Sequence, residues 1–368
     1  MSLVILHTEA SSGWGGQELR ILDEAAGLRA RGHDVQIAAP AGAPIVGAAR
    51  QRTIPVHVIP VDRRNWAGLR AIWDVVDSVR PDVIVTHSST DSWLAALATR
   101  LRRRAPPIVR TRHLSTPVAG GLLNRWLYGS AAAFIVTTGE AIRQMLIKQL
   151  ALDPARVISI PTGVDLARFH PADRSAARQA LGLADGGPII GIVATLRSWK
   201  GHRFLIDAMN DPRLASARLI IVGDGPQDST LRAKAAASGL SQRVLFAGRQ
   251  DDVTPWLQAF DVFALPSTGN EGVPQALMQA MAFAIPVVAT PVGGIGELVR
   301  DGETGLLVAP QDTGALASAI ARLLADPDLA QRLGTLGRRL VEKNYANAAM
   351  LDAMEKVLSR AAAGNIRQ

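Results

Sequence analysis

The strongest constraint on the fold is an alternation of short apolar runs with longer amphipathic stretches. In the first half of the chain, residues 17–31, 69–80 and 92–103 have the apolar spacing of helices. Between such stretches, short runs rich in β-branched residues predict strands at 3–7, 35–39, 56–59, 83–86, 108–112 and 134–137. This order is typical of a parallel sheet that is covered by helices on both faces.

The same alternation starts again after residues 162–188, which are rich in Gly, Pro, Asp and Arg and contain one predicted helix at 174–181. The second series of predicted strands lies at 189–194, 219–222, 244–247, 262–265, 287–289 and 305–308. Helices at 313–324, 327–344 and 346–362 end the chain. A length of 368 residues suits two domains. We therefore predict an α/β protein with doubly wound domains at 1–163 and 164–345, and a final helix, 346–368, that returns to the first domain.

Composition excludes several classes of protein. The chain has no cysteine, which excludes disulfide scaffolds, thiolate catalysis and Cys-ligated zinc. The chain has no run of 18 apolar residues, so no transmembrane helix is predicted. Its first residues predict a strand rather than a signal peptide. We therefore expect a cytoplasmic protein. One Asp-x-Asp sequence, Asp326-Pro327-Asp328, lies where two of the last predicted helices meet. At that position it predicts a helix N-cap rather than a metal site.

The positive charge is concentrated in the first domain. Residues 1–163 hold 19 Lys/Arg and 12 Asp/Glu, whereas residues 164–368 hold 21 and 20. Such an excess suits an anionic partner, and it leaves open a peripheral position on the inner face of the cytoplasmic membrane. A generally arginine-rich composition is the alternative explanation. Aromatic residues are only 4% of the chain, so the stacking side chains that usually accompany nucleic-acid binding are scarce, and no nucleic-acid partner is expected.

In open parallel sheets the ligand binds at the carboxyl ends of the strands, so residues directly after strands are the candidate site. Gly15 and Gly16 precede the first predicted helix, whose free N–H groups favour a phosphate, with a tight turn that needs positive φ as the alternative. Arg197 and Lys200 follow the first strand of the second domain and suit a diphosphate, with a solvated loop as the alternative. The Gly-x-Gly of 223–225 lacks the third glycine of a dinucleotide site, which is therefore not expected there.

A helix predicted at 275–282 follows Glu271, Gly272, Val273 and Pro274. Gln275 and Gln279 are four residues apart and share one face of this helix, and Leu277 and Met281 share another. One helix can thus present polar side chains to a ligand while its apolar face packs on the sheet.

Polar side chains also follow two strands of the first domain. His87 comes after the strand at 83–86, and Arg110, Arg112 and His113 lie at the end of the strand at 108–112. These four are candidate acceptor-side or catalytic residues, and hydrogen-bonded structural histidines are the alternative.

Together these motifs resemble the family-4 retaining glycosyltransferases of the GT-B fold. The resemblance covers nearly the whole chain and rests on the order and spacing of its motifs, which lie at 15–18, 110–113, 162–165, 197–201, 222–226, 271–274, 279–282 and 293–299. It implies two Rossmann-like domains that face a central cleft, the first binding an acceptor and the second a nucleotide-sugar donor. It also implies retaining transfer that needs no cofactor and no metal.

The resemblance assigns roles residue by residue. Arg197 and Lys200 match the pair that neutralises the donor diphosphate, Glu271 matches the glutamate that faces the sugar hydroxyls, and His113 matches a histidine near the transferred sugar. The remaining matches are to donor-binding positions, with Gln250 beside the nucleobase: Gly15, Gly16, Gln250, Gly272, Val273, Gln275, Ala276 and Gln279. The family has a second glutamate, which binds ribose, where this chain has Gln279. Loss of that charge costs about 1 kcal/mol of binding, so we expect weaker donor binding with activity retained.

The expected partners are a UDP- or GDP-linked sugar and a glycan or lipid-linked acceptor, as in the synthesis of lipopolysaccharide or exopolysaccharide. Trp66, Trp126 and the stretch 120–128 suggest contact with anionic lipid, with a buried helix as the alternative. Two other functions stay open. Because Gln279 replaces a glutamate, the chain could be a catalytically weak, glycosyltransferase-like partner subunit. The fold alone is equally compatible with a sugar-nucleotide epimerase or phosphorylase.

Overall fold

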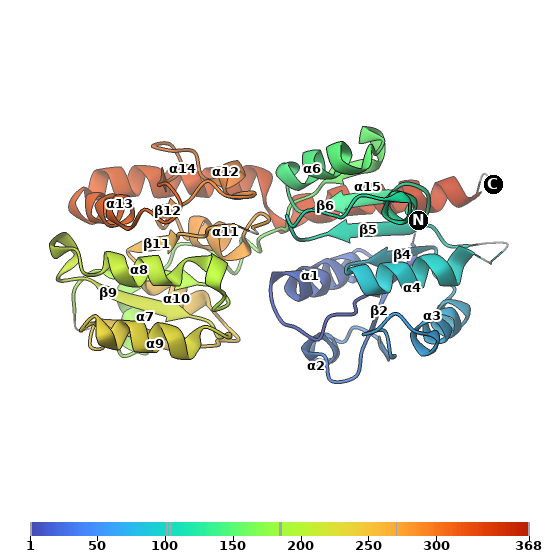
Figure 1. Cartoon of the computed structure of the whole chain (residues 1–368), viewed down its shortest axis with the longest axis horizontal. Coiled ribbons are helices and arrows are strands. Elements are labelled where there is room, and N and C mark those ends of the chain that lie inside the picture. The colour runs from blue at the N-terminus through green and yellow to red at the C-terminus, as the bar shows by residue number, and fades with distance from the viewer. Residues whose placement is uncertain (1, 101, 103–104, 184–185, 270, 367–368) are drawn as a thin grey trace. The chain divides into compact units, whose positions relative to one another are not determined.

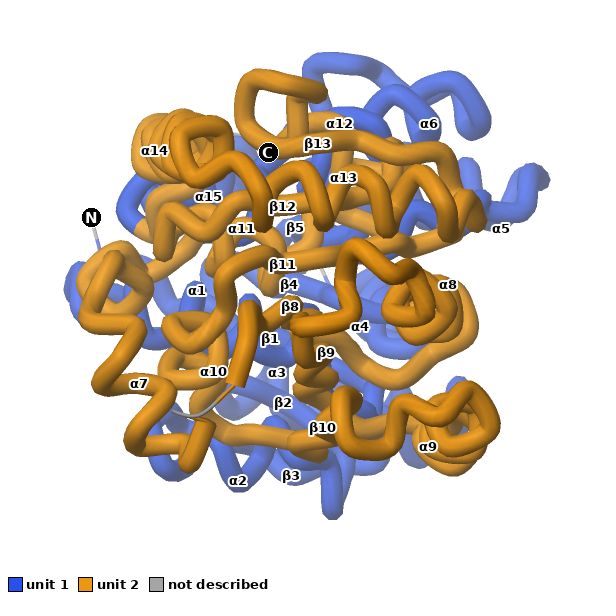
Figure 2. Tube along the Cα trace, turned by 90° about the vertical axis from the view of Figure 1, so that its left-hand side faces the viewer, with its two compact units in different colours: residues 1–163, 348–368 blue, residues 164–347 orange. Residues whose placement is uncertain are grey.

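The computed structural model describes residues 2–100, 102, 105–183, 186–269 and 271–366. The chain divides into two compact units, one of residues 1–163 with 348–368 and the other of residues 164–347 (Figure 2). Each unit is a parallel sheet with helices on both faces (Figure 1), as the repeated alternation predicts.

The first unit contains a seven-stranded parallel sheet in the order β3-β2-β1-β4-β5-β6-β7. Its strands are β1 (Val4–Thr8), β2 (Asp34–Ala39), β3 (Val56–Val58), β4 (Val83–Thr86), β5 (Ile108–Arg112), β6 (Phe134–Thr137) and β7 (Val157–Ser159). Its helices are α1 (Gly16–Ala30), α2 (Pro44–Gln51), α3 (Trp66–Val79), α4 (Ser89–Arg100), α5 (Leu122–Arg125), α6 (Glu140–Leu150) and α15 (Asn347–Ile366). A π-helical turn, η1 (Trp126–Ser130), continues α5.

Successive residues of the strands divide the apolar interior of this unit into two layers. Ile5 and Val85 belong to the cluster that includes α1, α2 and α15, whereas Leu6 and Ile84 belong to the cluster that includes α3, α4 and α6. This division follows from the two-residue repeat of a strand, which points neighbouring side chains to opposite faces. Both faces are buried, so the strands consist largely of apolar residues and their type could be predicted.

The last helix, α15, packs against α1 of the first unit. A Cβ atom at Gly27 would lie 2.4 Å from Leu351 Cδ1, so the absence of a side chain at residue 27 lets the two helices approach closely. Arg31 forms ion pairs with Asp352 at 2.8 Å and Glu355 at 3.0 Å. These contacts hold the C-terminal helix to the N-terminal domain.

The second unit contains a six-stranded parallel sheet in the order β10-β9-β8-β11-β12-β13. Its strands are β8 (Ile189–Val193), β9 (Arg218–Val222), β10 (Val244–Gly248), β11 (Val262–Leu265), β12 (Val287–Ala289) and β13 (Leu306–Leu307). Its helices are α7 (Arg174–Ala180), α8 (His202–Ala208), α9 (Asp228–Ala237), α10 (Thr254–Ala259), α11 (Gln275–Ala282), α12 (Ile295–Leu298), α13 (Thr313–Ala325) and α14 (Pro327–Asn344). Asp326 caps α14, as predicted, by accepting the Leu329 N–H at 3.0 Å.

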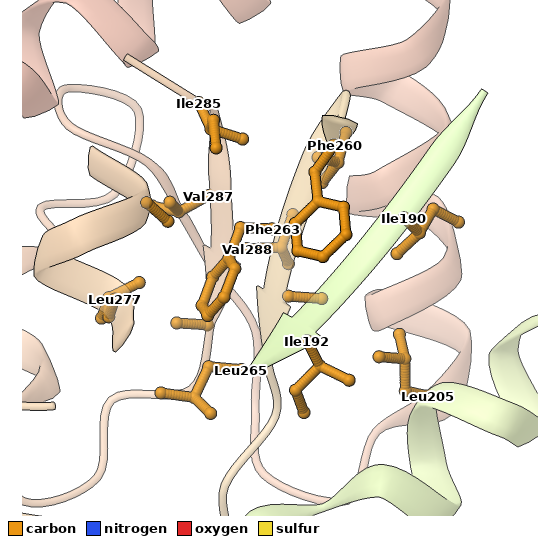
Figure 3. Close-up of a cluster of buried hydrophobic side chains, with 14 of the residues drawn as sticks. Ile190, Ile192, Leu205, Phe260, Phe263, Leu265, Leu277, Ile285, Val287 and Val288 are labelled. Atoms are coloured by element: carbon orange, nitrogen blue, oxygen red, sulfur yellow. The ribbon is translucent and has the colours of Figure 1, made fainter. Parts of the chain in front are cut away.

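One continuous apolar cluster holds the second unit together. Figure 3 shows side chains of β8, β11 and β12 between Leu277 of α11 and Leu205 of α8. Phe260 and Phe263 are fully buried among them. Because the cluster fixes both the sheet and α11, the loops at the carboxyl ends of these strands start from rigid positions.

Candidate functional site

The loops at the carboxyl edge of the second sheet are joined to one another by backbone hydrogen bonds. The Thr268 N–H after β11 donates to the Trp199 carbonyl after β8 at 2.7 Å. The Leu196 N–H after β8 donates to the Asp224 carbonyl after β9 at 2.8 Å. The Gly-x-Gly of 223–225 therefore supports the loop of Arg197 and Lys200.

Lys200, which is half-buried, and Glu271, which is buried, form an ion pair at this edge. Lys200 Nζ lies 2.8 Å from each oxygen of the Glu271 carboxylate. Ser267, at the end of β11 and fully buried, donates its hydroxyl to Glu271 Oε1 at 2.6 Å. Glu271 is only 3% exposed, and a carboxylate at such a site is stable because it is paired with a cation and hydrogen-bonded.

The loop after β12 holds the backbone of Glu271 in place. Gly293 has a φ of +57°, and a Cβ atom on it would lie 2.0 Å from the Glu271 carbonyl oxygen. The Gly294 N–H donates to the Glu271 and Gly272 carbonyls at 3.3 and 3.2 Å. Glycines at 293 and 294 thus permit the contact that positions the carboxylate.

Arg197 differs from Lys200 in its exposure. Its side chain is exposed, and its guanidinium carbon lies 5.8 Å from the centre of the Trp199 ring. The cation is therefore available to a ligand, and the ring restricts where it can lie.

Helix α11 begins at this same edge, as predicted. Its N-cap, Pro274, has no side-chain hydrogen bond to the first turn. Gln275, Ala276 and Gln279 are half-buried, whereas Leu277 and Met281 are buried under the helix. Polar side chains and free N–H groups of the first turn are therefore presented together.

The remaining donor-side candidates lie beside these elements. Gly272 is half-buried and Val273 is buried, both between Glu271 and α11. Gln250 lies after β10, where its amide nitrogen donates to the Ala247 carbonyl at 2.7 Å. The side chain of Gln250 thus folds back on its own strand.

In the first unit, Gly15 and Gly16 lie at the start of α1 in a loop that a buried carboxylate organises. Glu9 follows β1 and accepts the Ser11 N–H at 2.7 Å and a short hydrogen bond from the Gln17 amide. Burial raises the pKa of Glu9 to about 8, and the nearby Asp91 carboxylate adds to the rise. Gly15 is half-buried and Gly16 exposed, so their backbone is accessible at the edge of the first sheet.

The acceptor-side candidates occupy different depths. Arg110 is buried, with its guanidinium carbon 4.1 Å from the centre of the Tyr128 ring. Arg112 is half-buried and donates to the Thr116 carbonyl at 2.7 Å. His113 is half-buried and lies 3.1 Å, between ring nitrogens, from the buried His87. The structure therefore brings His87 and His113 together and places Arg110 in the interior.

Sequence reasoning missed several polar residues under this edge. Asp91 accepts hydrogen bonds from Thr8 Oγ1 at 2.8 Å and from the His87 N–H at 2.9 Å, and it is fully buried. One signal for buried polar groups here was the sequence His7-Thr8-Glu9, in which polar residues directly continue an apolar strand.

Two family models match the two units. The model described as "Glycosyltransferase Family 4" matches residues 14–168, and the model described as "Glycosyl transferases group 1" matches residues 187–326. The chain belongs to glycosyltransferase family 4. The resemblance inferred from the motifs is thereby confirmed.

Curated relatives of this chain carry several activities. A D-inositol 3-phosphate glycosyltransferase of Nocardia farcinica is 36% identical over 59% of this chain and 50% of its own length. The lipopolysaccharide core biosynthesis mannosyltransferase LpsB of Rhizobium meliloti is 34% identical over 50% of this chain and 55% of its own. The putative glycosyltransferase EpsD of Bacillus subtilis is 27% identical over 89% of each chain. The chain thus spans about half the length of the first two and most of the third.

Solved structures confirm the GT-B fold. Anabaena HepE in complex with UDP is 26% identical to this chain, with a TM-score of 0.84, over 98% of this chain and 100% of that one. The same Anabaena protein has been solved with UDP-glucose.

Among the described residues, no helix is both long and apolar enough to cross a membrane. In that same part of the chain, no group of three or more His, Cys, Asp or Glu side chains could hold a metal ion.

Proposed function

We propose that the chain is a retaining glycosyltransferase that moves a sugar from a nucleoside-diphosphate sugar to a hydroxyl of a glycan or lipid-linked glycan. The observation that carries this proposal is the Lys200–Glu271 pair, which lies near Arg197 and the start of α11 at one sheet edge. These groups supply cations for a diphosphate and a carboxylate for sugar hydroxyls.

In this proposal the donor is bound mainly by the second unit. Arg197, Lys200 and the N–H groups of Gln275 and Ala276 hold the diphosphate, and Glu271 accepts from the sugar hydroxyls. Gly272 and Val273 lie along the sugar and phosphates, the backbone near Gln250 borders the nucleobase, and Gln279 meets the ribose. In the first unit, Gly15, Gly16 and His113 are the residues to which the resemblance to the family assigns a part in the reaction.

The proposed reaction needs no protein nucleophile. The bond between the anomeric carbon and the phosphate oxygen lengthens, and positive charge develops on the sugar. The acceptor hydroxyl attacks on the face from which the phosphate leaves, and the departing phosphate takes up the hydroxyl proton. Arg197, Lys200 and the start of α11 stabilise the negative charge on the leaving phosphate, which is worth several kcal/mol. Since these cations perform that task, we propose that no metal or other cofactor is required.

Thermal unfolding with UDP, GDP, ADP and CMP, first without and then with Mg²⁺, tests the donor site. We expect UDP to act most strongly, because the similar HepE protein was solved with UDP and UDP-glucose. A nucleotide at about 100 times its Kd adds about 2.7 kcal/mol of stability, which is measurable as a shift of several degrees in Tm. A shift that needs Mg²⁺ contradicts metal independence, and no shift with any nucleotide contradicts the donor site.

A transfer assay then tests the reaction itself. With a glycan acceptor present, NMR of the product should show the anomeric configuration of the donor retained. Nucleoside diphosphate release that does not depend on acceptor would instead favour a sugar-nucleotide epimerase or phosphorylase.

Gln279→Glu should tighten nucleotide binding about fivefold, which corresponds to about 1 kcal/mol from a charge-assisted hydrogen bond to ribose. Calorimetric titration with the nucleotide selected above measures the change. The matched control is Gln331→Glu on the exposed surface of α14, which should leave the Kd unchanged. Loss of transfer in Gln279→Glu would show that this side chain does not bind the ribose.

We also propose that the acceptor lies in or near an anionic bilayer, as in the assembly of lipopolysaccharide. The support is the relative LpsB, the basic excess of the first unit, and apolar side chains beside exposed arginines. Trp66 is 84% exposed and follows Arg63 and Arg64, whereas Leu122 and Leu123 are 83% and 71% exposed and precede Arg125. Trp126 differs, because it is half-buried and packs on Trp93 with ring centres 5.6 Å apart.

Flotation with vesicles containing phosphatidylglycerol should recover the wild-type protein, and recovery should fall as salt screens the charges. The double variant Leu122→Asp/Leu123→Asp should reduce the bound fraction about tenfold. Leu97→Asp, on an exposed position of α4, is the matched control. Equal recovery of all three proteins, or no recovery of the wild type, would contradict the membrane contact.

A further inference from the structure

Three histidines of the first unit form a continuous hydrogen-bonded chain, of which the proposed reaction uses only His113. His7 lies in β1, His87 follows β4, and His113 follows β5, and these strands are neighbours in the sheet. His7 Nδ1 lies 2.9 Å from His87 Nε2, and His87 Nδ1 lies 3.1 Å from His113 Nε2. The centres of the first two rings lie 5.2 Å apart, and their planes differ by 10°.

Burial favours the neutral form of all three rings. Burial lowers the pKa of His7 to about 3, and the charge of Arg20 adds to this effect. Burial also lowers the pKa of His87 and of His113 well below the ordinary value. Each ring therefore carries one N–H and one bare nitrogen.

Three neutral rings joined in this way have only two consistent arrangements of their hydrogens. In one, His113 donates from Nε2 to His87, and His87 donates from Nε2 to His7, which leaves the His7 hydrogen on Nε2. In the other, all hydrogens lie on Nδ1, and both donations run in the opposite direction. Any mixture places two hydrogens or two lone pairs against each other.

The far end of the chain faces a carboxylate. His7 Nε2 lies 4.0 Å from Glu24 Oε1, and Glu24 Oε2 lies 3.4 Å from Arg20 Nε, with all three side chains fully buried. Within the described residues, neither His7 Nε2 nor either Glu24 oxygen has a hydrogen-bond partner. Electrostatics therefore decides whether His7 Nε2 carries the hydrogen.

The charge of Arg20 favours an ionised Glu24, because an arginine cannot become neutral. Burial raises the pKa of Glu24, and the guanidinium of Arg20 opposes that rise. An arginine keeps its proton, so a neutral Glu24 would leave a buried cation unpaired. A carboxylate at 4.0 Å attracts an N–H and repels a bare ring nitrogen, which favours the arrangement with the His7 hydrogen on Nε2.

We propose that His7 and His87 are positioning residues that fix His113 as its Nε2–H tautomer, so that His113 Nδ1 presents a lone pair to the ligand. His113 then accepts a hydrogen bond, and the group it recognises is a donor, such as a sugar hydroxyl. The identity of that ligand rests on the proposed function, whereas the tautomer is a property of the free protein.

Long-range ¹H–¹⁵N NMR of protein labelled at histidine nitrogens tests the tautomer without substrate. The His113→Asn variant, which lacks the relevant signals, assigns them. We expect His113 to show a protonated Nε2 and a bare Nδ1. A protonated Nδ1, or signals averaged between the two forms, overturns the proposal. Absence of nucleotide binding in the thermal assay would contradict the proposed function and leave this spectrum unchanged.

A pair of substitutions at His7 tests the link to catalysis. His7→Leu removes the acceptor for His87 and should shift the His113 signals toward a mixture and lower kcat/KM about tenfold. In His7→Asn the side-chain oxygen replaces Nδ1 as acceptor, so the tautomer should be restored and kcat/KM should return to within about threefold. His57→Asn on β3, where the ring contacts Gln36 at 2.7 Å, is the matched control for loss of a histidine. If His7→Leu unfolds, the wild-type spectrum and the His7→Asn variant still test the proposal. If His7→Leu folds and the tautomer of His113 is unchanged, the proposal is overturned.

Discussion

Replacing Lys200 by alanine should lower kcat for sugar transfer about a thousandfold, equivalent to about 4 kcal/mol of transition-state stabilisation. Its ammonium group is paired with a carboxylate that is only 3% exposed. The substitution therefore removes a cation and also leaves Glu271 without its charge partner. The remaining negative charge at this edge opposes the charge that develops on the leaving phosphate.

Steady-state rates with the donor varied at saturating acceptor measure this effect. Lys234→Ala is the matched control, because Lys234 also forms an ion pair, at 2.6 Å with Asp207, but on the surface of the same unit. We expect kcat of that variant to stay within about twofold of the wild type.

The division between kcat and KM decides the role of Lys200. If the lysine acts on developing charge, kcat falls more than KM rises. A higher KM with unchanged kcat would show instead that Lys200 binds ground state and transition state equally. An unchanged kcat/KM would remove Lys200 from the site.

The sheets could be predicted because the strands of a parallel sheet are buried on both faces and are therefore largely apolar. Each predicted strand is present, with ends that differ by at most one residue. β7 (Val157–Ser159) was not predicted, because three residues that end in a serine give too short an apolar run. Its position at the edge of the sheet depends on pairing with β6, which is a long-range contact.

The candidate site at the carboxyl edge of the second sheet could also be predicted in part. Arg197, Lys200 and Glu271 follow strands, and the sheet brings the ends of those strands together. The contact between Lys200 and Glu271 could not be read from the sequence, because 70 other residues separate them. The role of Gly293 could not be read from the sequence either, because only the folded chain shows how closely it approaches the Glu271 carbonyl.

The polar interior of the first unit was the least predictable part. Arg20 and Glu24 have the four-residue spacing of an ordinary surface ion pair on a helix, so their sequence predicts exposure. The structure buries both completely. What distinguishes them is the arrangement around α1, where Arg20 also donates to the Ile160 carbonyl at 2.6 Å beyond β7.

Replacing Arg20 by methionine should therefore destabilise the first unit by about 3–5 kcal/mol, because it leaves the Glu24 carboxylate buried and unpaired. It also removes the hydrogen bond to Ile160. The double variant Arg20→Met/Glu24→Leu should recover most of this loss, since apolar side chains of similar size replace both charges. Recovery in the double variant separates the charge effect from a simple loss of packing.

Urea unfolding followed by hydrogen exchange measures the change for each unit, with peptides from β1 and β4 reporting on the first. Arg70→Met is the matched control, because Arg70 and Asp74 have the same four-residue spacing on α3 but are 76% and 53% exposed. Its effect should stay below about 0.5 kcal/mol. A loss of less than 1 kcal/mol in Arg20→Met would show that Glu24 becomes neutral without cost, and Glu24 could then no longer select the tautomer of the histidine chain.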